Sequence, residues 1–253
     1  MAVKDNEDEG EPGSGLPASI EAAWGLRERP ARGPKPALSL ERIVAAAVDL
    51  AATEGIGAVS MSRVARALGS SPMSLYRYVT AKDELLALMV DAALADTPAP
   101  PAAAADWRDG LSRWAWTYHD ALRRHPWVLR IPISGPPVTP NQVAWLEEGL
   151  AALRDSGLTE PEKLSVILLL SGFVRNEATL AADIAAAVAA SGREVMPGWA
   201  QTLARVTDAE RFPALHAALA SEAFEQDDDM DDEFVWGLAR ILDGVAALIA
   251  ERS

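Results

Sequence analysis

The side chains best suited to chemistry in this sequence lie in the stretch 60–82, and they are suited to binding nucleic acid. Ser71, Ser74 and Tyr76 carry hydroxyl groups, which both donate and accept hydrogen bonds. Arg77 carries the guanidinium group that best fits the O6 and N7 atoms of guanine. Their spacing predicts a short helix that presents small polar groups at its start and reaches phosphates from its sides.

Residues for other kinds of chemistry lack the necessary pattern. The 253 residues include no cysteine, which excludes disulfides, thiolate zinc sites and cysteine nucleophiles. His119, His125 and His216 do not have the spacing of metal ligands. No nucleophile elbow, phosphate-binding glycine loop or pair of catalytic carboxylates is recognisable. We therefore predict no enzyme activity, no cofactor and no metal.

The charge of the chain is distributed unevenly. The net charge is −14, which by itself disfavours nucleic acid as a partner. Between Arg27 and Lys82, however, nine Lys or Arg residues face only four Asp or Glu residues. A basic region on an acidic body would orient the molecule on DNA.

Four helices are predicted around these side chains, because apolar residues recur at spacings of three and four from Ser39 onward. Ser39, Ser60 and Ser71 are suitable N-caps for the first three helices. Gly69 lies in the short turn between the second and third helices, which is the form of a helix-turn-helix motif. In that motif the second helix enters the major groove of DNA. The fourth helix is expected to begin by Lys82.

Residues 39–91 resemble the N-terminal domain of the TetR family of bacterial repressors. The resemblance is most specific in LGSSPMSLYRYVTAKDELL, where the family shows a glycine turn, a Leu-Tyr pair, an aromatic residue or His, and then a Lys followed by an acidic residue and two leucines. Further along, RRHPWVLRIPISGP and GLTEPEKLSVILLLSGFVRNE are similar to the tetracycline-repressor-like type of C-terminal domain.

The resemblance implies a DNA-binding role for particular residues. It implies phosphate contacts from Ser62, Tyr76 and Lys82, and it places Met73, Ser74 and Arg77 near base edges. Tyr78 stands where many relatives have His, and it either contacts a phosphate or only packs. The predicted DNA-binding residues of the motif are Ser62, Ser71, Met73, Ser74, Tyr76, Arg77, Tyr78 and Lys82.

Two further groups of basic residues have less specific roles. We expect Arg63 and Arg66 to lie on a solvated helix face. Residues 1–38 are predicted to be a flexible extension, acidic up to residue 19 and an extended cationic arm thereafter. In that arm Arg32 and Lys35 either contact the minor groove or are incidental charges of a leader segment.

The remainder of the chain, 96–253, is predicted to be a larger helical domain for ligand binding and dimerisation, so the fold class is all-α. The expected helices are 106–124, 140–155, 160–190, 208–222 and 232–251. This part of the chain has more aromatic side chains than a compact Ala/Leu core needs, which favours a ligand pocket. Packing in the core is the alternative for each of the proposed pocket residues, Trp114, His119, Trp145, Phe173 and Asn176.

Together these features predict a soluble, cytoplasmic regulator that does not contact membranes. The resemblance implies a homodimer formed by helices at about 160–185 and 232–251, which binds a pseudo-palindromic double-stranded operator. A small molecule in the C-terminal domain would release the DNA. The helix Lys82–Ala95 is expected to be the only continuous connection between the domains, and it would therefore act as the lever. Activation of transcription and ligand-independent DNA binding are the alternatives.

Overall fold

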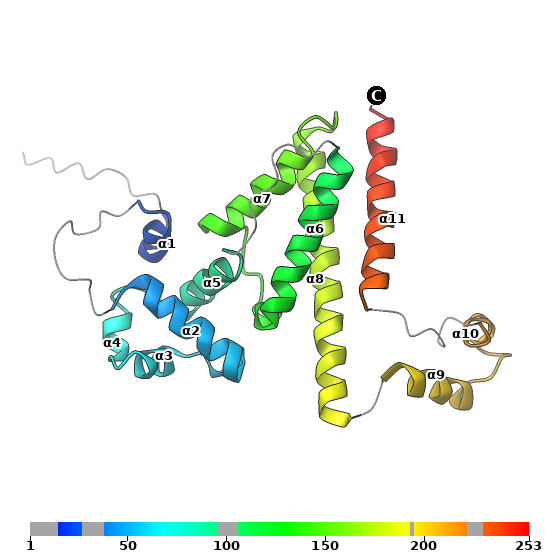
Figure 1. The fold of residues 1–253 in the computed structure, drawn as a ribbon, viewed down its shortest axis with the longest axis horizontal. Coiled ribbons are helices and arrows are strands. Elements are labelled where there is room, and N and C mark those ends of the chain that lie inside the picture. Colours follow the sequence, from blue (N-terminus) through cyan, green and yellow to red (C-terminus); the bar gives the residue numbers. More distant parts are fainter. Residues whose placement is uncertain (1–14, 27–37, 96–105, 193–194, 222–229, 253) are drawn as a thin grey trace, which may run out of the picture. The chain divides into compact units, whose positions relative to one another are not determined.

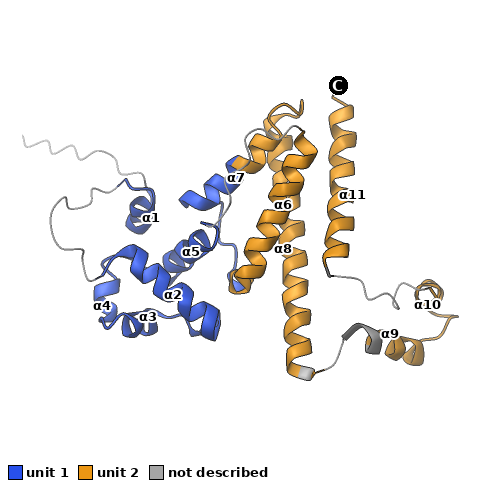
Figure 2. Cartoon of the chain, in the orientation of Figure 1, with its two compact units in different colours: residues 1–97, 130–147 blue, residues 98–129, 148–253 orange. Residues whose placement is uncertain are grey.

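The computed structural model describes residues 15–26, 38–95, 106–192, 195–221 and 230–252, and within these ranges the chain is helical without strands (Figure 1). The predicted all-α fold class is confirmed. The chain divides into two compact units (Figure 2). Unit 1 comprises residues 1–97 and 130–147, and unit 2 comprises residues 98–129 and 148–253.

Unit 1 contains the predicted helix-turn-helix motif. Ser39, Ser60 and Ser71 are the N-caps of three helices, and each side chain accepts a hydrogen bond from the backbone N–H three residues later. Gly69, with φ +61°, makes the turn between α3 and α4 in a conformation that favours glycine. The helices of unit 1 are α1 (Ala18–Ala23), α2 (Leu40–Glu54), α3 (Met61–Ala67), α4 (Pro72–Leu75), α5 (Lys82–Ala93) and the first eight residues of α7 (Pro140–Ala152), together with the 3-10 helix η1 (Ile56–Ala58).

The core of unit 1 fixes the orientation of α4. Leu75 in α4 and Val79 just after it are fully buried, together with Ile43 of α2 and Val64 of α3. Helix α4 ends at Leu75, and residues 76–78 continue as a turn, so this helix is short, as the sequence predicts. Both buried side chains thereby hold α4 against α2 and α3, which leaves the first residues of α4 at the surface.

The chain before α2 does not have the predicted extended conformation throughout. Residues 18–23 form the helix α1, which packs against α5. Ile20 is buried, and the Ser19 hydroxyl donates a hydrogen bond to Glu84 Oε2 at 2.7 Å. Trp24 Nε1–H donates to the carbonyl of Val138 at 2.8 Å. The prediction of a flexible extension is therefore wrong for this segment, because Ile20 supplies an apolar side chain that α5 can bury.

Unit 2 is built around long helices. The predicted helices near 106–124, 140–155, 160–190 and 232–251 are confirmed, but the helix predicted over 208–222 is limited to α10. The helices are α6 (Trp107–Arg124), α8 (Glu160–Ser191), α9 (Val195–Val206), α10 (Pro213–Leu219), α11 (Met230–Ala250) and the end of α7, with the 3-10 helix η2 (Pro126–Arg130) at the boundary of the units. Helix α9 was not predicted. Its Pro197 lies in the first turn, where a missing N–H costs little.

Helices α6, α8 and α11 form the core of unit 2. Leu111 and Leu122 of α6, Leu170 of α8 and Phe234 of α11 are fully buried. Two ion pairs join α6 to α11, from Arg108 to Asp243 at 2.6 Å and from Arg123 to Asp231 at 2.7 Å. These pairs are partly exposed, so burial of the apolar side chains dominates the stability of the unit.

Gly237 allows α11 to approach α8 closely. A Cβ atom at this position would lie 2.6 Å from Phe173 Cε2 and 2.7 Å from Cζ. We expect Gly237→Ala to destabilise the protein, because overpacking costs about 1–3 kcal/mol and exceeds the gain in helix propensity of up to about 1 kcal/mol. Urea denaturation measures the change. Adding Phe173→Leu should recover part of the loss, and a more stable Gly237→Ala variant would contradict the expectation.

Candidate nucleic-acid interface and effector site

The N-terminal end of α4 presents few free hydrogen-bonding groups. Ser71 Oγ accepts a hydrogen bond from the backbone N–H of Ser74 at 3.3 Å, and the two hydroxyl oxygens lie 2.9 Å apart. Both hydroxyls therefore already take part in the helix cap. Met73 is 75% exposed, and Arg77 is exposed just after the helix. The groups most accessible to a base edge are thus one thioether side chain and one guanidinium group.

Ser62, Tyr76 and Lys82 are all exposed, as phosphate contacts require. They lie near the start of α3, just after α4 and at the first position of α5. A hydroxyl, a phenol and an ammonium group each donate to phosphate oxygens. All three belong to unit 1, so they are attached to the core that orients α4.

Tyr78 differs from these residues because its hydroxyl is already used. It donates a hydrogen bond to the carbonyl of Leu38 at 3.0 Å, and the side chain is half-buried. A phenol has one hydrogen to donate, and a phosphate oxygen can only accept. The geometry therefore favours the packing role for Tyr78, in which it holds the start of α2 against the turn that follows α4.

The two arginines of α3 have different surroundings. Arg63 Nη2 donates to both carboxylate oxygens of Glu54, at 2.7 and 2.6 Å. This pair is half-exposed and joins α3 to the end of α2. Arg66 is exposed. Both positions agree with the solvated helix face expected from the sequence. The charge of Arg63 is explained by its ion pair with Glu54.

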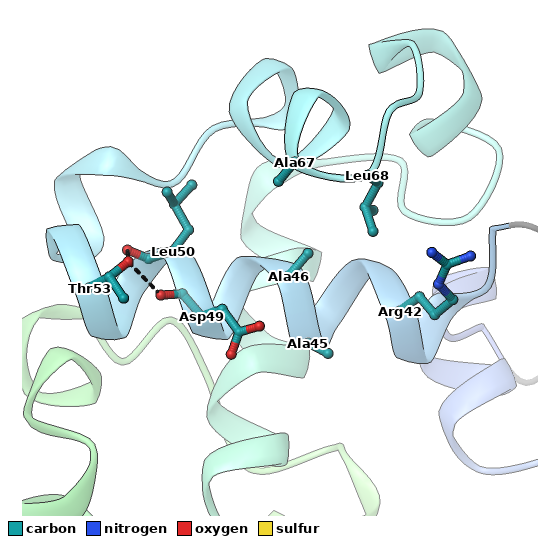
Figure 3. Close-up of a pocket in the computed structure, with 8 residues that line it drawn as sticks. All are labelled: Arg42, Ala45, Ala46, Asp49, Leu50, Thr53, Ala67 and Leu68. Atoms are coloured by element: carbon teal, nitrogen blue, oxygen red, sulfur yellow. Dashed lines mark hydrogen bonds between the residues drawn. The ribbon is translucent and has the colours of Figure 1, made fainter.

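An open groove lies along α2 and the end of α3 in unit 1 (Figure 3). Its volume is about 440 Å³, and its lining residues are Arg42, Ala45, Ala46, Asp49, Leu50, Thr53, Ala67 and Leu68. Alanine and leucine side chains form the apolar part, while Thr53 uses its hydroxyl to donate to the carbonyl of Asp49 at 2.8 Å. The residues predicted to bind an effector are not among those that line this groove.

Two of the predicted effector residues meet in an aromatic cluster of unit 2. His119 stacks on Phe234 with ring centroids 4.3 Å apart, and Phe173 stacks on the same ring at 5.4 Å. Trp116 contacts Phe234 edge-on at 4.6 Å and His119 at 5.7 Å. The cluster therefore draws on α6, α8 and α11. Trp116 and Phe234 were not predicted for the site, although Trp116 lies one helical turn before His119 and so shares its face.

The other predicted effector residues are not brought into this cluster. Trp114 is buried in unit 2 beside Tyr118, with ring centroids 5.7 Å apart. Asn176 is exposed next to Glu177. Trp145 is buried in unit 1, where its Nε1–H donates to the carbonyl of Leu94 at 3.3 Å. Trp145 thus packs against the end of α5.

His119 is buried among aromatic side chains. It is 3% exposed, and within the described part of the chain its Nδ1 has no hydrogen-bond partner. Burial lowers the pKa of His119, and the positive charge of Arg123 lowers it further, whereas Asp231 and Asp120 act in the opposite direction. The neutral imidazole is therefore the favoured form in the folded protein.

The lowered pKa of His119 predicts acid sensitivity. The unfolded chain binds a proton near pH 6.5, while the folded chain binds it only at lower pH. The associated stability is thus present above about pH 6.5 and is lost as the pH falls toward the folded-state pKa. His119→Phe keeps an aromatic ring on Phe234, so its free energy of unfolding should decline less between about pH 7 and 5. Parallel declines for the two proteins in urea titrations would contradict this origin.

The chain is similar to known proteins over nearly its whole length. Residues 43–89 match the family model described as bacterial regulatory proteins, tetR family, and residues 97–249 match the tetracyclin repressor-like C-terminal domain. The HTH-type transcriptional repressor DrrR1 of Streptomyces coeruleorubidus is 39% identical over 246 residues, which cover 95% of this chain and 89% of that protein. The class E tetracycline repressor of Escherichia coli is 29% identical, over 54% of this chain and 65% of that protein.

Solved structures are also similar to this chain over most of its length. Apo ActR from Streptomyces coelicolor has a TM-score of 0.73 and 28% identity, covering 87% of this chain and all of ActR. ActR in complex with actinorhodin has a TM-score of 0.72 and the same identity, covering 85% of this chain and 97% of ActR. The similarity therefore includes both the helix-turn-helix and the larger helical unit.

Proposed function

Because this chain belongs to the TetR family of bacterial transcriptional regulators, we propose that it is a repressor that leaves its operator when a small molecule binds. The family binds operator DNA, forms dimers and responds to small-molecule effectors, and it is a family of regulators rather than enzymes. The observation that carries the proposal is the helix-turn-helix of unit 1, whose α4 leaves Met73 and Arg77 accessible for base contacts. The protein would act in the cytoplasm, where its operator is.

In the proposed complex, α4 enters the major groove of each half-site. Arg77 pairs with guanine, and Met73 contacts the methyl group of thymine. Ser74 lies between them in sequence, and its hydroxyl is proposed to lie near the base edges. The proposed phosphate contacts come from Ser62, Tyr76 and Lys82, Ser71 caps α4 at the end that faces the DNA, and Tyr78 packs.

The proposed arm contacts of Arg32 and Lys35 lie outside the described residues. Deleting residues 1–36 would also remove α1, which packs on α5. The double change Arg32→Ala and Lys35→Ala is therefore the cleaner test, because it keeps α1. A minor-groove role requires lower affinity and a shallower salt dependence of operator binding. Unchanged values would leave the incidental-charge alternative.

The proposed dimer partner is a second copy of this chain. Among the helices of unit 2, α8 and α11 both leave large apolar side chains at the surface, namely Leu164, Leu168, Leu169 and Leu180 of α8 and Val235 and Trp236 of α11. By length and composition α8 could also span a membrane. We prefer the dimer because α11 contributes exposed apolar side chains as well, and because the family dimerises. The two-fold symmetry would present two copies of α4 to a pseudo-palindrome.

We propose an aromatic small molecule as the effector, bound in unit 2. One ActR structure contains actinorhodin and another contains (S)-DNPA. In this chain the candidates for contacting the effector are Trp114, His119, Phe173 and Asn176. Trp145, packed in unit 1, would act through the position of α7.

Selection of genomic fragments by the purified protein tests the proposed function. A single enriched pseudo-palindrome, released when actinorhodin or (S)-DNPA is added, would support it. Enrichment without any base preference would instead indicate ligand-independent DNA binding. A reporter placed behind the selected operator separates the remaining alternative, since a repressor lowers transcription and an activator raises it.

A further inference from the structure

The two units are connected at more points than the single connection expected from the sequence. The chain passes from one unit to the other between residues 97 and 98, between 129 and 130, and between 147 and 148. The third passage lies inside α7, which contributes residues 140–147 to unit 1 and 148–152 to unit 2 (Figure 2). The expectation that Lys82–Ala95 is the only continuous connection is therefore wrong. An uninterrupted helix also joins the units.

Asp91 of α5 holds the start of α7. Its side chain is buried, with 7% exposure for the residue. One carboxylate oxygen accepts from the backbone N–H groups of Asn141 at 2.8 Å and Gln142 at 3.2 Å. The other accepts from Asn141 Nδ2 at 2.9 Å, and the same amide donates to the Asp91 carbonyl at 3.1 Å. A carboxylate at the N-terminus of a helix also interacts favourably with the helix dipole.

This cap comes from α5 although α7 has a residue of its own for the purpose. Thr139 precedes the helix, and its carbonyl accepts from Val143 N–H at 2.9 Å, as an N-cap carbonyl does. A threonine there normally caps with its hydroxyl. The Thr139 hydroxyl is instead buried without a hydrogen-bond partner among the residues that the structure describes. The first backbone N–H groups of α7 thus donate to Asp91 of α5 instead of to a residue next to them in sequence. The position of α7 therefore depends on α5.

The connection is tight at both ends of α7. One turn after the cap, Trp145 Nε1–H donates to the carbonyl of Leu94, the residue that ends α5. Within unit 2, a Cβ atom added at Gly149 would lie 2.7 Å from Ile167 Cδ1 and 3.2 Å from Trp114 Nε1. Close packing of this kind leaves little room for α7 to slide independently of its neighbours.

We infer that Asp91 is a positioning residue through which the DNA-bound state of unit 1 is transmitted along α7 to unit 2. The inference rests on the proposed function, because it requires operator binding. Coupling is reciprocal, so an effector that acts on DNA binding through unit 2 must be matched by an effect of DNA on unit 2. Operator DNA alone can therefore reveal the coupling.

Hydrogen–deuterium exchange of the full-length protein, with and without a selected operator fragment, tests this inference. In the parent protein the operator should slow amide exchange in α2–α4 and also in residues 148–152 at the end of α7. Asp91→Ala should retain the slowing in α2–α4 and lose it in 148–152. Asp91→Asn should keep it, because the amide oxygen can still accept from both backbone amides, and the Asn141 side chain can rotate so that its oxygen accepts from the new NH2 group. Thr139→Val removes a buried hydroxyl that bonds to no described residue and keeps the backbone carbonyl, so it is the matched control and should behave as the parent.

The outcomes separate this inference from the proposed function. If the parent binds no DNA sequence selectively, the proposed function fails. If the parent binds its operator but exchange in 148–152 does not change, the inference is overturned whatever the variants do. If the slowing in 148–152 persists in Asp91→Ala, Asp91 is not the positioning residue. If Asp91→Ala does not fold, the comparison of the parent with Asp91→Asn is the test. Loss of the slowing in 148–152 in Asp91→Asn would also overturn the inference.

Discussion

Arg77→Ala is expected to remove most of the preference of this protein for its operator over other DNA. Loss of one arginine–guanine pair costs about 1–3 kcal/mol, which corresponds to roughly 5- to 150-fold in affinity per half-site. Arg77 is exposed directly after α4, and neighbouring Ser71 and Ser74 have hydroxyls engaged with each other. No equally suitable group of α4 would replace the guanidinium. Fluorescence anisotropy at fixed salt, with operator and scrambled DNA, measures the change in preference.

Arg63→Ala is the matched control for this prediction. Arg63 lies in the preceding helix and is paired with Glu54 in the free protein. Its removal should leave the ratio of operator to scrambled affinities unchanged. The decisive comparison for Arg77 is between the selected operator and an operator in which one guanine is replaced. Only replacement of the guanine that Arg77 contacts should leave the affinity of Arg77→Ala unchanged. A uniform loss of affinity for all DNA would show that Arg77 contacts phosphate instead.

The elements of unit 1 that depend on local sequence could be predicted. Ser39, Ser60 and Ser71 cap their helices as expected, because an N-cap is selected by a side chain and the amides within three residues of it. Helix α1 escaped prediction for the opposite reason. Ala18–Ala23 is too short to be stable alone, and its helical conformation depends on burial of Ile20 in unit 1.

The effector residues illustrate the same limit. Aromatic composition favoured a ligand pocket lined by residues that include Trp145 and His119, with packing in the core as the alternative for each, and both side chains are buried. It could not indicate which neighbours they meet, because a helical period identifies a face and not its partner. Trp145 packs on the end of α5, whereas His119 packs on Phe234 of α11. Asp91 was missed likewise, since a lone aspartate in α5 gives no sign that it caps α7.

Leu168→Glu is expected to convert the proposed dimer into monomers and to weaken operator binding by a larger factor than Arg77→Ala. Leu168 is 75% exposed in the single chain, so a polar side chain there should not disturb the core of unit 2. In a dimer formed through α8 and α11, the same position would be covered, and an unpaired carboxylate in an apolar interface costs several kcal/mol. A monomer can occupy only one half-site. Loss of the linked second contact typically reduces apparent affinity by about 10²–10⁴-fold.

Ile133→Glu separates the interface from a general effect of added charge. Ile133 is 74% exposed and lies in unit 1, before α7, so it matches Leu168 in exposure but not in location. Its variant should remain dimeric by light scattering, whereas Leu168→Glu should have half the mass at the same concentration. Binding to a single half-site should be equal for both proteins, because α4 is unchanged. A Leu168→Glu protein that stays dimeric would exclude this part of α8 from the interface, and the apolar surface of α8 would then require a different partner.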